Sequence, residues 1–222
     1  MDWTAAWVTL RLALWTTGLL FVLGLPLAYW LATTHFPGRG VIGALVTLPL
    51  VLPPTVVGFY VLVATAPDSL IGQLLALIGV DRLAFTFPGI VLGSVLFNLP
   101  FAVRPFTAAF QSVDRRLIEA AWCLGVSRWR AFTGVMLPLA WPGILTGLVL
   151  TFAHSLGEFG VVLMVGGNIP GVTRTLSIAI YDEVQALNYA AADRMALLLV
   201  VFAVSVLTLV YLLERKGLRR WV

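Results

Sequence analysis

The sequence predicts an all-α protein that crosses a membrane about five times. Of its 222 residues, 60% are hydrophobic and only 11% are charged, whereas soluble domains carry about 25% charged residues. A hydrocarbon core about 30 Å thick needs about 20 apolar residues of helix, and helix is required because lipid offers the backbone no hydrogen-bond partner. Five apolar runs are long enough, at about 8–33, 41–65, 86–111, 141–165 and 195–213.

The first run is interpreted as a retained span. It follows Asp2 rather than a basic stretch, it is too long for the apolar part of a signal peptide, and it lacks a clear small-x-small cleavage site. The five spans are expected to form one transmembrane domain over residues 1–222. The sequence stops about nine residues after the last span, so no C-terminal regulatory domain is expected.

The second run contains closely spaced prolines, with Pro53 and Pro54 adjacent and followed by Thr55. Adjacent prolines remove backbone donors and kink or break a helix. A broken helix persists in a membrane only where protein or a water-filled cavity surrounds it. Two interpretations stay open: these residues form a pathway wall near a gate, or they make a packing kink. After this run, residues 67–78 predict a short amphipathic helix along the interface.

The basic residues predict an outside N-terminus and a cytoplasmic C-terminus, because cytoplasmic loops carry an excess of Lys and Arg. This orientation places ten basic residues inside and four outside. The inside set is Arg39, Arg104, Arg115, Arg116, Arg128, Arg130, Arg215, Lys216, Arg219 and Arg220, and the outside set is Arg11, Arg82, Arg174 and Arg194. The net charge of +4 is therefore attributed to membrane topology, and no nucleic-acid partner is expected.

Residues 112–138, the coupling segment, predict two short helices on the cytoplasmic side. Asp114 is suited to cap a helix that carries Glu119, Ala120 and Ala121. Gly125 is a natural residue to end that helix in the left-handed conformation, and Ser127 can cap the next one.

The same segment resembles the EAA loop of ABC importer permeases: Glu119-Ala120-Ala121, three residues, Gly125, nine residues, then Val135-x-Leu137-Pro138. Val135 replaces the usual Ile. The resemblance implies the transmembrane domain of a type I ABC importer, in which this loop docks into a separate ATPase subunit. The chain has one lysine and no Gly-x-x-x-x-Gly-Lys-Ser/Thr sequence, so it has no P-loop to hold nucleotide phosphates. It is expected to be a non-catalytic subunit.

A narrower resemblance is to molybdate permease subunits. It rests on residues 49–58, on the sequence from His154 to Gly160, and on 166–175; sulfate permeases share the Leu-Gly-Glu core of residues 156–158. This implies a bacterial inner-membrane, multi-pass protein that imports molybdate. The implied partners are a second copy of the chain, two ATPase subunits and an extracytoplasmic oxyanion-binding protein. Molybdate, tungstate and sulfate remain open as substrates.

An oxyanion with two negative charges needs a lumen lined with hydrogen-bond donors. The candidates are Thr55, Ser155, Asn168, Thr173 and Arg174. Arg174 is expected outside, where it could meet the anion, contact a binding protein, or be an ordinary surface arginine.

Glu158 is the one acid predicted within a span, and a charge there should face the bundle interior and have a partner. His154 precedes it by four residues, so the two are expected on one helical face. A structural or gating hydrogen-bond role is preferred to direct contact with an anion. Two such groups, and a single cysteine, Cys123, do not predict a metal site or cofactor.

Two other classes of function use the same residues. A proton-coupled secondary carrier would use His154 and Glu158, but it gives the EAA pattern no role. An intramembrane enzyme would use His154, Ser155 and Glu158, but residues on successive turns of one helix do not make a converging Ser-His-acid set.

Overall fold

The computed structural model describes residues 2–218, with side chains to Thr208. The basic side chains of Arg215, Lys216, Arg219 and Arg220 lie outside the described part. Within it all the secondary-structure elements are helical: α1 (Trp3–Thr33), α2 (Arg39–Thr47), the 3-10 turn η1 (Leu48–Leu50), α3 (Pro54–Ala64), α4 (Leu70–Leu77), α5 (Phe87–Gln111), α6 (Arg115–Cys123), α7 (Arg128–Ala131), the π-helical turn η2 (Phe132–Met136), α8 (Leu137–Leu156), α9 (Gly160–Gly166), α10 (Leu176–Gln185) and α11 (Tyr189–Leu218).

Four described helices are long and apolar enough to cross a membrane, and a bent pair supplies a fifth span if it is counted as one. The four are α1, α5, the continuous helix Arg128–Leu156, and α11. The predicted all-α, multi-span class is confirmed. The predicted second span is the bent pair, in which the chain bends by 112° between Arg39–Leu50 and Pro54–Ala64. The prolines thus break this helix, as their missing donors predict.

The predicted fourth span is wrong in its last part. The expected span at 141–165 is not one helix: α8 ends at Leu156, and α9 begins at Gly160 after a break. The helix that contains α8 begins well before the predicted span, at Arg128, and runs unbroken to Leu156. Where α8 begins, the Leu137 N–H donates to the Phe132 carbonyl, and this bond closes a π turn. This wider turn lies just where the ring of Pro138 would clash with the carbonyl of Gly134 in a regular helix.

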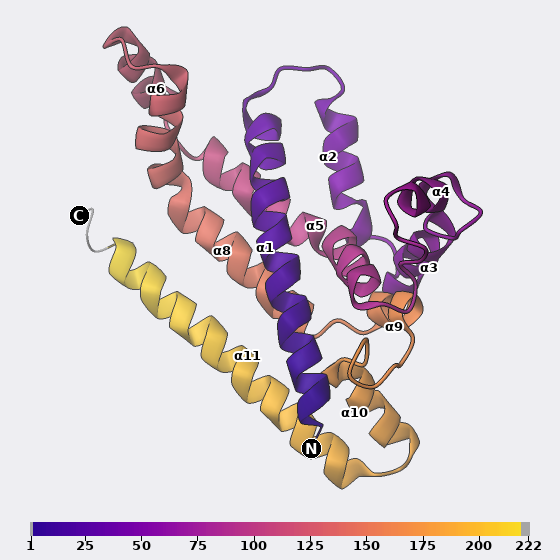
Figure 1. The fold of residues 1–222 in the computed structure, drawn as a ribbon. Helices are drawn as coiled ribbons and strands as arrows, with labels where there is room; N and C mark the ends of the chain where they lie inside the picture. Colours follow the sequence, from indigo (N-terminus) through magenta and orange to yellow (C-terminus); the bar gives the residue numbers. More distant parts are fainter. Residues whose placement is uncertain (1, 219–222) are drawn as a thin grey trace.

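Helices α1, α5 and α8 form the centre of the bundle (Figure 1). One buried apolar cluster joins them and includes Leu20, Val103, Phe106 and Ile144. A second cluster joins the N-terminal halves of α1 and α5 to α3 and α9. The broken segments α3 and α9 are therefore packed on the rigid bundle, which covers part of the backbone freed by the breaks.

The coupling segment and the N-terminus lie at opposite ends of the molecule. Figure 1 shows α6 at the top, at the same end of the molecule as the C-terminal end of α1, and the N-terminus near α10 and the start of α11 at the bottom. This arrangement agrees with the predicted topology, in which the N-terminus and residues 112–138 face opposite sides. Which side is cytoplasmic stays a prediction from the basic residues.

Candidate functional site

A cavity of about 630 Å³ opens beside both helix breaks. Pro54, Thr55, His154 and Glu158 all line it. These four residues were candidates from two different predicted spans, and the structure brings them together. The rest of its lining consists of Phe97, Ala153, Gly157, Phe159, Gly160 and Val161. Pro53 is the residue before α3 and is not among the residues that line the cavity.

The second break determines how Glu158 is placed. Gly157 ends α8, and Phe159 leaves helical geometry with φ −129° and ψ −67°. The expectation that His154 and Glu158 share a helical face is therefore wrong, because the helix stops between them. They nevertheless meet through Asn98 of α5.

Close contact between α3 and α9 depends on Gly160. A Cβ at this position would lie 2.9 Å from the Cβ of Pro54, so Gly160→Ala must push the two helices apart.

We expect Gly160→Ala to lower the free energy of unfolding by about 1–3 kcal/mol, as overpacking does. Thermal unfolding of the purified protein measures it. Gly18→Ala in α1 is the matched control, because its Cβ meets nothing within 4 Å and alanine is preferred to glycine in helices by about 0.5–1 kcal/mol. Equal melting of the two variants would contradict the packing argument.

Glu158 is held by a chain of buried donors from two helices, α1 and α5. The Thr16 hydroxyl of α1 donates to Ser94 Oγ (2.8 Å), and the Ser94 hydroxyl donates to Glu158 Oε2. Asn98 Nδ2 donates to Glu158 Oε1 (2.6 Å). All four residues are buried. Both carboxyl oxygens thus have partners, as buried polar groups require.

His154 completes this network. Asn98 Nδ2 also donates to the Ser94 carbonyl (2.9 Å), which fixes the orientation of the amide. Asn98 Oδ1 therefore faces His154 Nδ1 (2.8 Å), and since an amide oxygen only accepts, Nδ1 is assigned as the donor. The ring stacks on Phe101 with centroids 3.8 Å apart. His154 lines the cavity, and its Nε2 makes no hydrogen bond to the described residues.

The other donor candidates are less available to an anion. Ser155 is buried, and its hydroxyl donates to the Thr151 carbonyl (2.8 Å). Thr173 is also buried and donates to the Gly166 carbonyl (2.7 Å). These hydroxyls are used within the fold, so their expected place in a donor-lined lumen is not supported.

Asn168 and Arg174 form a small ionic cluster with Asp182 of α10. Arg174 Nε donates to Asn168 Oδ1 (2.6 Å), and Asn168 Nδ2 donates to Asp182 Oδ2 (2.7 Å). The Arg174 guanidinium also pairs with Asp182 at 3.4 Å, with 28% of its side chain exposed. Arg174 is thus paired within the fold, and its expected contact with the anion or with a binding protein stays a prediction. It fixes the loop between α9 and α10.

The coupling segment has the caps that its sequence predicts. Asp114 Oδ1 accepts the Arg116 N–H (2.9 Å) before α6, and Ser127 Oγ accepts the Arg130 N–H (3.4 Å) before α7. Gly125 has φ +78°, and the Val126 N–H donates to the Ala121 carbonyl (3.0 Å). Such a left-handed glycine ends a helix and turns the chain, so α6 and α7 form a compact projection.

This projection exposes large apolar side chains to solvent. Leu124 is 84% exposed and Trp129 is 72% exposed, with Leu117 and Trp122 about half exposed. Glu119 is also exposed, and it pairs with Arg115 one turn earlier at 3.1 Å. Ala120 is exposed, and Ala121 is half-buried. Apolar side chains with a rim of charge are typical of an interaction surface.

The end of the EAA pattern lies where this projection joins the membrane helix. Val135 belongs to the π turn and Leu137 and Pro138 begin α8. Val135 and Leu137 are half-buried, whereas Pro138 is exposed.

Comparison with known proteins decides the family. Residues 24–219 match the family described as binding-protein-dependent transport system inner membrane component. The chain belongs to this family. It is therefore a multi-pass protein of the cytoplasmic membrane and a transport permease component.

Similar members of the family cover nearly the whole chain. It is 50% identical over 210 residues to the molybdenum transport system permease protein ModB of Azotobacter vinelandii, which covers 95% of this chain and 93% of that protein. ModB of Escherichia coli K12 is 40% identical over 186 residues, or 83% and 80% of the two chains. A protein of Chlorokybus atmophyticus, named probable sulfate transport system permease protein cysT, is 35% identical over 83% of this chain but only 64% of its own length.

Solved structures establish the fold. An inward-facing structure of the MetNI methionine ABC transporter gives a TM-score of 0.75 at 20% identity, covering 97% of this chain and 95% of that one. A bacterial alginate ABC transporter in complex with a periplasmic protein gives 0.74 at 23% identity, covering 96% and 78%. The expected transmembrane fold of ABC importers is confirmed.

Sequence reasoning missed Ser94, Asn98 and Asp182. A signal was present for the first two, because Ser94 and Asn98 are polar residues four apart in an otherwise apolar run.

Within the described residues, no group of three or more His, Cys, Asp or Glu side chains could hold a metal ion.

Proposed function

We propose that this chain is the membrane-spanning subunit of an ATP-driven importer for molybdate. The observation that carries the proposal is the 50% identity to a molybdenum transport permease over nearly the full length of both chains. The sulfate-permease relative is less similar and longer, with 64% of its length covered. Sulfate is therefore the second candidate, and tungstate, which resembles molybdate in size and charge, is expected to share the pathway.

The coupling segment is proposed to dock into a partner ATPase. The exposed Leu124, Trp129 and half-exposed Trp122 supply an apolar surface, and the small side chain of Ala120 allows close approach. Glu119 lies at the rim of this surface, where it can pair with a basic residue of the partner. The unbroken helix from Arg128 to Leu156 then links the docking surface to the cavity.

The cavity beside the two breaks is proposed to be part of the pathway. Pro54, Thr55 and His154 line it, and the buried network of Glu158 fixes the orientation of His154. One chain supplies only one side of a lumen, so a second copy is proposed to close it, with two ATPase subunits below. An extracytoplasmic binding protein would deliver the anion to the opposite end, near the loop that Arg174 stabilises.

Transport by the reconstituted complex tests the substrate and the energy source together. The chain, its ATPases and its binding protein are placed in proteoliposomes with ATP on the ATPase side, and radioactive molybdate uptake is measured. We expect uptake to need ATP, to persist when an ionophore removes the proton gradient, and to be inhibited by tungstate but not by excess sulfate. Uptake that follows the proton gradient without ATP would indicate a secondary carrier. Full competition by sulfate would indicate a sulfate permease.

A further inference from the structure

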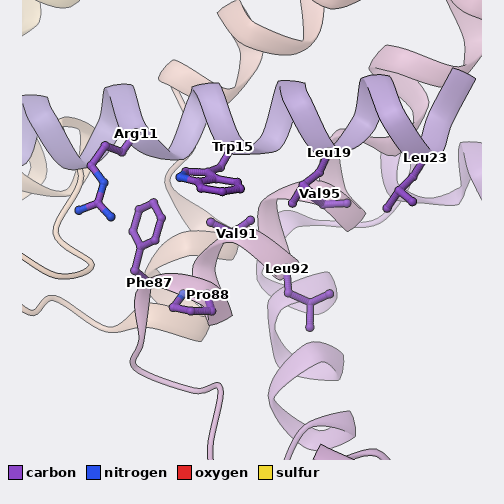
Figure 2. A pocket seen from close by; sticks show the side chains of 9 residues that line it. All are labelled: Arg11, Trp15, Leu19, Leu23, Phe87, Pro88, Val91, Leu92 and Val95. Atoms are coloured by element: carbon purple, nitrogen blue, oxygen red, sulfur yellow. The ribbon is translucent and has the colours of Figure 1, made fainter. Parts of the chain in front are cut away.

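A second cavity, of about 450 Å³, lies between α1 and the beginning of α5. It shares no lining residue with the cavity that contains His154. Arg11, Trp15, Leu19 and Leu23 recur at every fourth position of α1 and form one wall, as Figure 2 shows. The opposite wall comes from α5. Arg11 is the one charged residue that lines this groove, and every other lining residue is apolar.

The sequence places Arg11 at the boundary of the hydrocarbon core. From Leu12 to Ala32 there is no charged residue, and these residues of helix extend about 31 Å at 1.5 Å each. That length matches a hydrocarbon core about 30 Å thick. Trp3, Trp7 and Trp15 are exposed on the same face as Arg11, and tryptophan is enriched where lipid headgroups meet hydrocarbon. The groove therefore begins at headgroup depth and runs into the bilayer.

The charge of Arg11 has no acidic partner in the part of the chain that the structure describes. Its guanidinium lies 4.4 Å from the centroid of the Phe87 ring, and neither of the two described ion pairs includes it. Ionisable side chains of membrane-spanning helices usually pair with another polar or charged group. Because no acid lines the groove, a bound group here meets a positive charge alone.

We propose that this groove binds an anionic glycerophospholipid, with its phosphate on Arg11 and one acyl chain between α1 and α5. From Arg11 to Leu23 the groove follows α1 for about 18 Å, close to the depth of one leaflet, about 15 Å. Leu19, Leu23 and Leu92 contact the chain. An anionic headgroup is favoured over a zwitterionic one, because an ammonium group would face Arg11 with no acid nearby. The predicted topology places this lipid in the outer leaflet.

Lipid retention by the purified complex tests the site. The complex is reconstituted in nanodiscs that contain equal amounts of phosphatidylglycerol and phosphatidylethanolamine. It is then extracted and washed in detergent, and the lipids that stay bound are identified by native mass spectrometry. We expect the wild type to retain phosphatidylglycerol preferentially and Arg11→Gln to retain about tenfold less, the loss of one charge-assisted contact. Arg194→Gln is the control: Arg194 is also exposed, lies in the first turns of α11, and does not line the groove. It should retain the wild-type amount.

A second variant tests the acyl-chain part without affecting the charge. Leu23 is 60% exposed at the deep end, so Leu23→Trp fills the groove with little risk to folding. It should reduce retention of phosphatidylglycerol with long chains and leave that with short chains unchanged. The proposal is overturned if Arg11→Gln retains as much phosphatidylglycerol as the wild type, or if both headgroups are retained equally. It is also overturned if the Trp15→Cys variant forms a disulfide cross-link between two copies of the chain, because a second chain would then cover the groove. None of these results depends on which anion is transported.

Discussion

Glu119→Lys is expected to abolish ATP-driven molybdate uptake while the chain still inserts into the membrane. The substitution places a cation on a projection that already carries Arg115 and Arg116 in the same helix. The proposed contact with a basic partner residue would become repulsive. A charge pair at an interface contributes mainly to specificity and to the stability of the complex, so the partner ATPase should no longer co-purify.

Arg115→Gln separates the partner contact from the pair within the helix. Arg115 is the intramolecular partner of Glu119, and both side chains are exposed. Such surface pairs contribute about 0–1 kcal/mol to stability, so this variant should insert and transport at near the wild-type rate. Co-purification of the ATPase and uptake of molybdate are measured for both variants. Unchanged uptake by Glu119→Lys, or equal loss in both variants, would refute the docking role.

Glu158→Ala is expected to destabilise the membrane domain strongly. It leaves the Ser94 hydroxyl without its acceptor and one N–H of the Asn98 amide unpaired, and both groups are fully buried. Each unsatisfied buried group costs about 1–3 kcal/mol, so the total is on the order of 2–6 kcal/mol. Released from these donors, the break between α8 and α9 should also lose its fixed position beside α5.

The matched control is Asp193→Ala, which removes an exposed acid near the start of α11 and should leave the melting temperature unchanged. Thermal unfolding of purified protein is the measurement. Glu158→Gln retains one oxygen acceptor and should fall between the two. If Glu158→Ala melts at the wild-type temperature, the network has no structural role.

Local chemistry in the sequence was enough to predict the coupling segment. Asp114, Gly125 and Ser127 each act on their own turn of backbone, through a cap or a left-handed conformation, and the structure confirms all three. The break before Pro54 was predictable for the same reason, since a missing donor is a property of the residue itself.

The arrangement around Glu158 was not predictable from local pattern. Averaged over the length of a span, residues 141–165 remain apolar despite His154 and Glu158, so an apolar window cannot show that α8 ends at Gly157. The partners Ser94 and Asn98 are 64 and 60 residues away, and only tertiary packing of α5 against α8 brings them close. Asp182 was missed for the same reason, because its contacts with Asn168 and Arg174 form only when the loop after α9 folds back.

The helix that runs from Arg128 through the π turn to Leu156 spans 29 residues, or about 43 Å at 1.5 Å per residue. It is continuous between its two ends. A tilt imposed at the surface beside Trp129 would therefore be delivered as a sideways displacement at Gly157, where the helix ends. In mechanical terms, the molecule has a lever whose far end lies beside the cavity that His154 lines.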